Sequence, residues 1–139
     1  MRIIDELWIT TASGLTLFNQ SKDQFDPLLI GGFFSAIHTF AQNLGEKEVK
    51  SIILGESKLI VYQGILQDKR FLFISRSPKK VKNDMIIKLL KLVETKFFQQ
   101  YKDHLVKWNG DSDLFNTFGP IIQEIFNDTP TKRAKEAIW

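Results

Sequence analysis

The chain has no cysteine and only two histidines, His38 and His104. The absence of cysteine excludes a disulfide scaffold, a cysteine-ligated zinc site and a thiol nucleophile, and it fits a reducing compartment. The histidines fall on two different predicted helices, and no serine or threonine stands in a recognisable triad pattern with them. We therefore expect a protein that is not an enzyme and that holds no metal or cofactor.

Long apolar segments and strong net charge are also missing. No apolar run approaches the ~18 residues that a transmembrane helix needs. Asp5 and Glu6 interrupt the segment in which a signal peptide would have its apolar region. The formal net charge is +3, which is too small and too dispersed to indicate a nucleic-acid partner. These absences favour a soluble, cytoplasmic protein that does not bind nucleic acid.

The sequence does contain enough apolar surface for one compact domain. Hydrophobic residues make up 43% of the 139 residues, and twelve residues are phenylalanine. A chain of this size buries about two-thirds of its surface when it folds. We assign residues 1–128 to a single domain. Residues 129–139 are polar and form a predicted C-terminal tail.

The first half of the chain predicts a hairpin and then a helix. Residues 3–11 and 15–19 are rich in strand formers, and Ser13-Gly14 between them marks a tight turn. Asp26-Pro27 combines a helix-capping side chain with a proline suited to the first helical position. Apolar residues then recur at spacings of three and four, which predicts an amphipathic helix that ends near Gly45. These residues are Leu29, Phe33, Ile37, Phe40 and Leu44.

The second half predicts three strands and two helices. Residues 49–54, 59–66 and 71–75 form a meander, and Ser77-Pro78 repeats the capping signature at the start of a long helix. Asn109-Gly110 ends that helix, and Asp111 or Ser112 begins the last one. Pro120 lies inside the last helix and predicts a kink or a broken start. The predicted order is β-β-α-β-β-β-α-α.

Three of the predicted strands are apolar at consecutive positions. The runs are residues 52–54, 59–62 and 71–74. Neighbouring strand residues point to opposite faces, so a sheet built from such strands is apolar on both faces. Helices must then cover both faces. The sequence predicts a three-layer α-β-α domain, in the α+β class, with a five-stranded antiparallel sheet.

This order resembles the longin domain over roughly residues 1–128. The resemblance is carried by the opening strand at residues 4–9, the Ser13-Gly14-Leu15 turn, the helix after the second strand and the meander. The closing helix around residues 114–126 is similar to the end of the small clathrin-adaptor subunits and of the N-terminal domain of the signal-recognition-particle receptor alpha subunit. Roadblock domains are related to this family.

The resemblance implies a function in protein assembly. Longin-like domains are generally non-catalytic, bind small GTPases, and serve in GTPase-regulating or membrane-trafficking complexes. Several pair with a second longin or roadblock domain. We therefore expect an interaction module that binds a small GTPase and forms a homodimer or a longin/roadblock heterodimer. A fold alone does not determine a function.

Two glycines in the predicted first helix are candidate contact residues. Gly31 and Gly32 are adjacent, and each costs roughly 1 kcal/mol in a helix interior relative to alanine. No phosphate-binding loop motif follows them. Glycine permits close approach of another backbone. The pair therefore indicates close packing against the sheet or contact with a partner.

A basic cluster precedes the predicted long helix. Arg76, Lys79, Lys80 and Lys82 place positive charge at a helix start, where it opposes the helix dipole. An acidic partner surface or acidic lipid headgroups would give these charges a role. The alternative function is therefore a membrane-peripheral targeting or trafficking component. A solvated helix start without a partner accounts for the same residues.

Overall fold

The computed structural model describes residues 3–21, 27–46, 49–106 and 113–127. The elements follow the predicted order, with a 3-10 helix before the last α-helix. The strands are β1 (Glu6–Thr11), β2 (Thr16–Gln20), β3 (Ser51–Ile53), β4 (Ser57–Leu66) and β5 (Lys69–Pro78), and the helices are α1 (Pro27–Asn43), α2 (Asn83–Val106), η1 (Asp113–Phe118) and α3 (Gly119–Asn127).

The strands form one antiparallel sheet in the order β2-β1-β5-β4-β3. The central pairing joins distant parts of the chain, with Trp8 of β1 opposite Ile74 of β5. A register shift between Ile9 and Thr10 interrupts the pairing of β1 with β2. Gly14 closes the first hairpin at a φ of 103°, a conformation that glycine adopts without steric cost.

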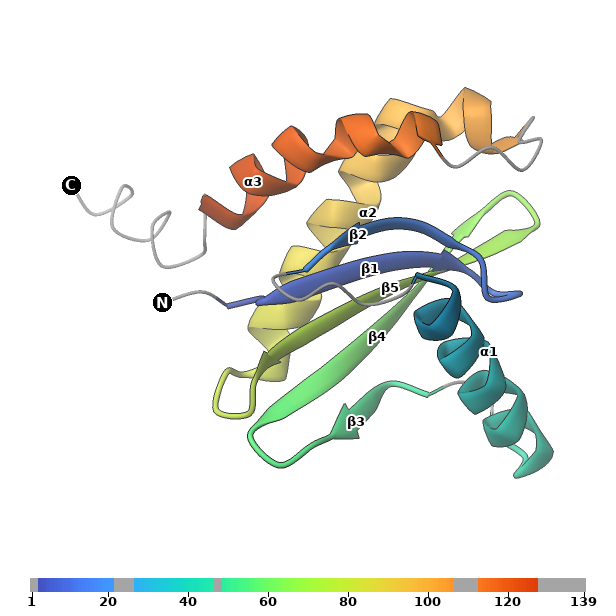
Figure 1. The fold of residues 1–139 in the computed structure, drawn as a ribbon, viewed down its shortest axis with the longest axis vertical. Coiled ribbons are helices and arrows are strands. Elements are labelled where there is room, and N and C mark those ends of the chain that lie inside the picture. Colours follow the sequence, from blue (N-terminus) through green and yellow to red (C-terminus); the bar gives the residue numbers. More distant parts are fainter. Residues whose placement is uncertain (1–2, 22–26, 47–48, 107–112, 128–139) are drawn as a thin grey trace.

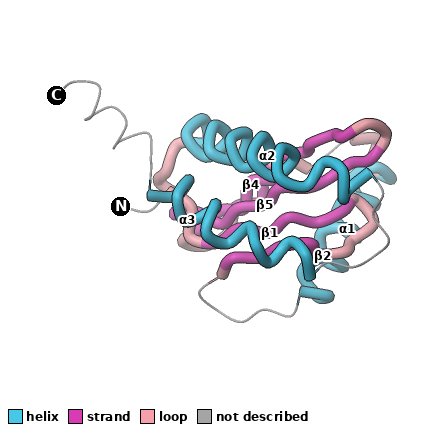
Figure 2. Tube along the Cα trace, turned by 90° about the horizontal axis from the view of Figure 1, so that it is seen from above, coloured by secondary structure: helices cyan, strands magenta, loops and turns pink. Residues whose placement is uncertain are grey.

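The larger apolar cluster fills one side of the sheet. Phe73 of β5 and Phe97 of α2 are fully buried, and their rings meet edge to face at 6.0 Å between centroids. Phe118 of η1 packs on Phe97 at 5.1 Å, and Ile122 of α3 joins the same cluster. Figure 2 shows α2 and α3 together on this side.

A smaller cluster fills the other side. It joins Phe34 of α1 to Trp8, Leu72 and Ile74 of the inner strands and to Leu59 of β4. Figure 1 shows α1 at the lower right, below the right-hand ends of the strands. The prediction of a sheet apolar on both faces, with helices on both sides, is confirmed. Strand residues of opposite parity enter opposite clusters, as the consecutive apolar runs in β4 and β5 require.

The run at residues 52–54 was interpreted wrongly. β3 has three residues and lies at the edge of the sheet. Ile53 and Leu54 are 58% and 42% exposed, and only Ile52 packs against the smaller cluster. Consecutive apolar residues at a sheet edge therefore do not indicate burial on both faces.

The predicted helix start at Ser77-Pro78 was also wrong. Pro78 is the last residue of β5 and pairs with Ser57 of β4. A proline at a strand end removes no essential ladder hydrogen bond. The long helix begins at Asn83, after a turn in which the Lys82 carbonyl accepts hydrogen bonds from the N–H groups of Met85 and Ile86 at 3.1 and 3.3 Å.

The prediction of a broken start at Pro120 is confirmed. η1 ends at Phe118, and Pro120 is the second residue of α3. The missing N–H of proline has no intrahelical partner to lose at that position. The predicted stop at Asn109-Gly110, the predicted start at Asp111 or Ser112 and the polar tail at 129–139 lie outside the described residues.

Candidate interaction surface

Four of the five residues of the apolar stripe that predicts α1 do not pack on the sheet, whereas Ile37 is half-buried. Leu29, Phe33, Phe40 and Leu44 are 71%, 50%, 63% and 67% exposed. Their spacings of four, seven and four residues place them along one outward side of the helix. We name these four residues, with the exposed Gly32 and Ala36 between them, the α1 surface.

The sheet-facing side of α1 uses a different set of residues. Phe34 and Ala41 are 4% and 6% exposed, and Gly31 is buried. No residue of Pro27–Asn43 is acidic or is a lysine or arginine. Both sides of the helix are therefore apolar, and periodicity alone did not separate the inner side from the outer one. An exposed apolar side of this kind on a single helix indicates an interaction site.

The two glycines of α1 have different surroundings. A Cβ on Gly31 would meet the carbonyl carbon of Gly14 at 2.7 Å and would collide with the carbonyl oxygen. The same Cβ would lie 3.1 Å from Thr16 Oγ1. A Cβ on Gly32 would meet no described atom within 4 Å. Gly31 therefore packs on the β1–β2 turn, and Gly32 lies on the outward side as part of the α1 surface.

A hollow continues the α1 surface toward the sheet edge. Its volume is about 740 Å³, and Phe40 and Leu44 of the α1 surface line it. Val49 and Ser51 line its other side, on the segment that leads into β3. Exposed apolar side chains and an adjacent hollow thus form one continuous area on this side of the molecule.

The four predicted basic residues do not form one patch. Arg76 lies in β5 and donates from Nη1 to Glu6 Oε1 at 2.5 Å and from Nε to Ser57 Oγ at 3.2 Å. Glu6 has a side chain that is 3% exposed and also accepts a hydrogen bond from Ser21 Oγ at 2.5 Å. Arg76 therefore holds strands together. Its assignment to a partner site stays a prediction.

The three lysines of the cluster are exposed. Lys79 and Lys80 lie in the turn after β5, and Lys82 lies just before α2. The N–H of Lys79 donates to the carbonyl of Glu56 at 3.3 Å, so an acidic residue lies beside the same turn. Lys58, in contrast, is buried, and its Nζ donates to the carbonyl of Val81. The basic surface consists of Lys79, Lys80 and Lys82.

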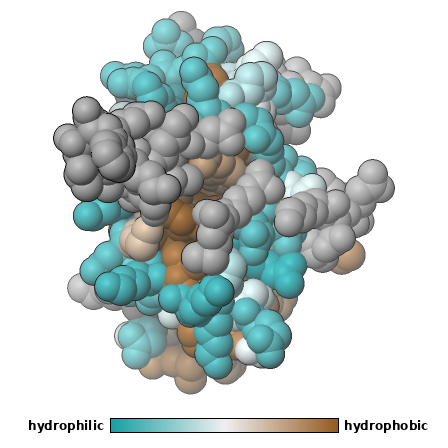
Figure 3. Space-filling model, turned by 90° about the vertical axis from the view of Figure 1, so that its left-hand side faces the viewer, coloured by the Kyte–Doolittle hydropathy of each residue, from teal (hydrophilic) through white to brown (hydrophobic). Residues whose placement is uncertain are grey.

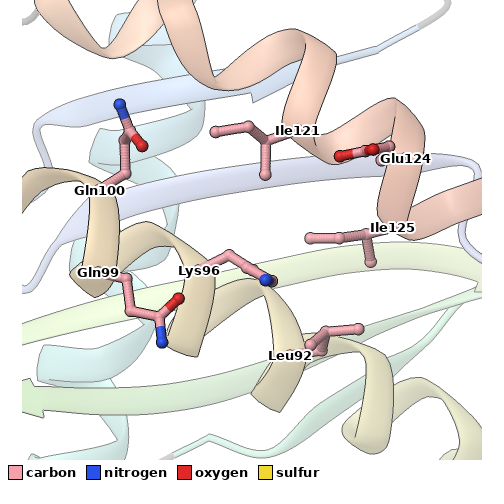
Figure 4. Close-up of a pocket in the computed structure, with 7 residues that line it drawn as sticks. All are labelled: Leu92, Lys96, Gln99, Gln100, Ile121, Glu124 and Ile125. Carbon is pink, nitrogen blue, oxygen red and sulfur yellow. The ribbon is translucent and has the colours of Figure 1, made fainter.

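A second hollow lies between α2 and α3 and has a volume of about 490 Å³. Figure 4 shows Leu92 and Lys96 rising from α2, with Ile121, Glu124 and Ile125 facing them from α3. Gln99 and Gln100 complete the lining. Its lining holds one lysine and one carboxylate among apolar side chains and amides.

The titratable groups with shifted pKa values lie near α2. Burial raises the pKa of the Glu94 carboxyl, and the smaller effects of Tyr62 and Lys91 lower it. Tyr62 Oη donates to Glu94 Oε1 at 3.5 Å, and burial, followed by the charge of Glu94, raises the tyrosine pKa. Burial also raises the pKa of Tyr101, whose hydroxyl lies 2.5 Å from Thr117 Oγ1.

Neither histidine belongs to a larger polar constellation. His38 Nε2 lies 3.3 Å from Gln42 Nε2, and His104 is exposed. Among the described residues, no group of three or more histidine and acidic side chains is placed to hold a metal ion. No described helix is both long enough and apolar enough to cross a membrane. On the side of the molecule that is at the left in Figure 1, Figure 3 shows a narrow apolar strip with polar side chains near it.

The structure is an α+β fold with the element order on which the resemblance to longin domains rests. No family model matches the chain, and no curated protein matches it. Among solved structures, MglB of Myxococcus xanthus is similar with a TM-score of 0.48 and 16% identity over 70% of this chain and 85% of MglB. The gliding protein MglB from Thermus thermophilus is similar with a TM-score of 0.41 and 16% identity over 67% of this chain and 71% of that chain.

Proposed function

We propose that this chain is a non-catalytic interaction module of the longin type that binds a small GTPase through the α1 surface. The longin-like fold supports the partner class. The observation that carries the docking site is the outward apolar side of α1, where four large side chains are each at least half exposed. A module of this kind works as part of a GTPase-regulating or trafficking complex.

The chemistry of the α1 surface suits the centre of a protein interface. Interface cores are rich in aromatic residues and poor in charged ones. Phe33 and Phe40 supply two aromatic side chains on one line, and α1 carries no lysine, arginine or acidic residue. Gly32 precedes Phe33, and Ala36 lies between the two phenylalanines, so small residues beside the rings permit close approach of a partner backbone. Burial of one such phenylalanine contributes roughly 1.5–3 kcal/mol.

Calorimetric titration against the small GTPases of the host, each in its GDP-bound and GTP-analogue-bound state, tests this proposal. Wild type is expected to bind at least one of them. Phe40→Glu is expected to weaken binding by more than about tenfold, because it places a charge in an apolar interface. Gln42→Glu is the matched control, since it adds the same charge at an exposed position outside the α1 surface.

The titration separates the two parts of the proposal. Absence of binding to every GTPase in both nucleotide states rejects the partner class. Binding that Phe40→Glu leaves unchanged rejects the α1 surface as the docking site. The alternative occupant of this surface is a second copy of the chain or a longin/roadblock partner. Light scattering tests for the second copy: the wild type would then be a dimer, and Phe40→Glu would dissociate it.

The basic surface supports an alternative proposal, in which the protein binds acidic membrane surfaces from the cytoplasm. Lys79, Lys80 and Lys82 are exposed within four residues of one turn, and each lysine near an acidic membrane contributes about 1 kcal/mol. Flotation with acidic liposomes should then recover wild type but not the triple charge reversal to glutamate. Equal recovery of both proteins rejects the membrane role.

A further inference from the structure

One half of the β4 edge has no neighbouring strand in the described part of the chain. β4 pairs with β5 along all ten of its residues, from Ser57 to Leu66. On its other side β3 pairs only with residues 58–60, and the last hydrogen bond runs from Val61 N–H to the Lys50 carbonyl at 2.9 Å. Figure 1 shows β3 beside only part of the length of β4. We name residues 62–66 the open β4 edge.

The pairing pattern fixes which backbone groups the open β4 edge presents. Val61 bonds outward to Lys50, and backbone groups of alternate residues in an antiparallel strand point to the same side. Gln63 and Ile65 therefore direct their N–H and C=O groups away from β5. Within the described part of the chain, no residue pairs with the N–H groups and carbonyls of these two residues, which would be the groups that bond to an added strand.

The open β4 edge lacks the features that keep sheet edges from pairing. Natural edge strands carry charged side chains, prolines or bulges, or are covered by another element. Residues 62–66 contain no charged residue and no proline, and the pairing of β4 with β5 runs without a register shift. Ile65 is 60% exposed on this edge. Residues 62–66 therefore carry no charge, proline or bulge that would hinder pairing with an added strand.

A groove of about 530 Å³ runs along the edge on its α2 side. Ile60 and Tyr62 of β4 form one wall, and Asn83, Ile87 and Lys91 of α2 form the other. The charged residues that line it are Lys91 and Lys50. Gly64 marks the far end, where the Glu94 carboxylate and the Phe73 ring fill the space that a Cβ would occupy.

The two sides of the edge select different side chains of an added strand. The side chain opposite Tyr62 enters the groove, whose charged lining residues, Lys50 and Lys91, favour a carboxylate, while Lys91 also interacts with Glu94. The side chain opposite Gly64 meets Glu94, where a carboxylate is disfavoured. Side chains opposite Gln63 and Ile65 point to the α1 side of the sheet, where Gln63 and Ile37 border a space of only about 10 Å³. The added strand is therefore expected to place apolar residues toward α1 at every second position, and one acid among the residues that face the groove.

We infer that the open β4 edge binds an extended segment of a partner protein by strand addition, with apolar side chains toward α1 and an acidic side chain beside Lys91. Main-chain hydrogen bonds to Gln63 and Ile65 would supply affinity, and the groove would supply specificity. This site is separate from the α1 surface. It goes beyond the proposed function by naming a second class of ligand for the same module.

The probe is a capped seven-residue peptide in which valine alternates with threonine around a single central aspartate. A second peptide carries lysine in place of aspartate. Amide nitrogen–proton NMR titration is expected to show saturable shifts at Gln63 and Ile65 with the aspartate peptide, and at least about tenfold weaker binding of the lysine peptide. Lys91→Glu should reverse that preference.

Gln63→Pro removes an outward N–H without removing a hydrogen bond to β5. It is expected to weaken binding by about tenfold, whereas the matched Gln63→Ala variant keeps the N–H and binds as wild type does. Circular dichroism reports whether the proline variant folds. If it does not fold, the wild-type NMR shifts and the Lys91→Glu reversal still decide the outcome.

Three results would overturn this inference: equal binding of both peptides, shifts that avoid Gln63 and Ile65, or no binding. A dimer in light scattering that Gln63→Pro dissolves would assign the edge to a second copy and also overturn it. Phe33→Glu lies on the α1 surface and is expected to leave peptide binding unchanged. Absence of GTPase binding by the wild type, together with peptide binding at Gln63 and Ile65, would reject the proposed function alone.

Discussion

Gly14 and Gly31 lie in direct backbone contact, so that the β1–β2 turn rests against the first turns of α1. A Cβ on Gly14 would meet the Gly31 carbonyl oxygen at 3.0 Å, and a Cβ on Gly31 would meet the Gly14 carbonyl carbon at 2.7 Å. Because the crowding atoms belong to backbone, they cannot rotate away as a side chain can. This contact fixes where α1 crosses the sheet and therefore which side of α1 faces outward.

Gly31→Ala is expected to destabilise the fold by about 1–3 kcal/mol, because the added methyl overpacks a backbone contact. Gly32→Ala is the matched control on the adjacent residue. Its added methyl meets no described atom within 4 Å, and the change is expected to stabilise α1 by about 0.5–1 kcal/mol. Urea unfolding of both variants measures the difference. Equal effects of the two substitutions would contradict the close contact between Gly14 and Gly31.

Arg76→Ala is expected to lower the free energy of unfolding by about 2 kcal/mol, since it leaves the Glu6 carboxylate buried without its cation. The expectation is below that for a fully buried pair because the Arg76 side chain is 39% exposed and solvent screens its charge. Lys79→Ala, at an exposed position, is expected to change the free energy of unfolding by less than about 0.5 kcal/mol. Similar losses of unfolding free energy in both variants would show that Arg76 does not stabilise the fold through Glu6.

Glu94 makes stability depend on pH in a defined direction. Burial raises the pKa of its carboxyl in the folded state, so the folded state holds the proton more tightly than the unfolded chain does. The free energy of unfolding therefore falls as the pH rises through the folded pKa, and the favourable contribution is complete only below the unfolded pKa.

Glu94→Gln removes this dependence and can still accept the Tyr62 hydrogen bond. The difference in unfolding free energy between Glu94→Gln and wild type is expected to increase in favour of the variant as the pH rises from about 4 to about 7. Urea unfolding at several pH values measures it. A difference that stays constant or changes sign in the other direction would show that burial does not control this carboxyl.

Phe33→Ser and Leu29→Ser are expected to leave stability nearly unchanged, within about 0.5 kcal/mol, since both side chains are at least half exposed to solvent. The control is Phe34→Ser, which alters an adjacent ring that is 4% exposed. That change should cost about 3 kcal/mol or more, because it removes a buried aromatic side chain and adds a hydroxyl. A large loss for Phe33→Ser would mean that the outward stripe supports the fold.

The layers could be predicted from the sequence because neighbouring residues of a strand point to opposite faces of the sheet. Phe71 and Phe73 point to one side of the sheet, and Leu72 and Ile74 point to the other, so a consecutive run at the sheet centre requires two covering layers. The same rule failed at Ile53, where the strand lies at an edge. Whether a strand lies at the centre or at the edge of the sheet decides between burial and exposure of such a run. That position depends on residues distant in the sequence.

The site was harder to predict than the fold. The apolar period through Phe33 and Phe40 gave the helix correctly but not its orientation, because Phe34 and Ala41 form a second apolar line on the same uncharged helix. The role of Arg76 depends on Glu6, which is 70 residues away in the chain. The absence of charge from the whole of α1 was the available signal for an interaction surface.

The most direct test of the α1 surface is affinity purification from the native host with wild type, Phe40→Glu and Gln42→Glu as baits, followed by quantitative mass spectrometry. A small GTPase is expected among the proteins retained by wild type and by Gln42→Glu, and Phe40→Glu is expected to retain less than about a tenth as much. Equal recovery of the same GTPase by all three baits would contradict the account, and so would the absence of any GTPase from the wild-type sample.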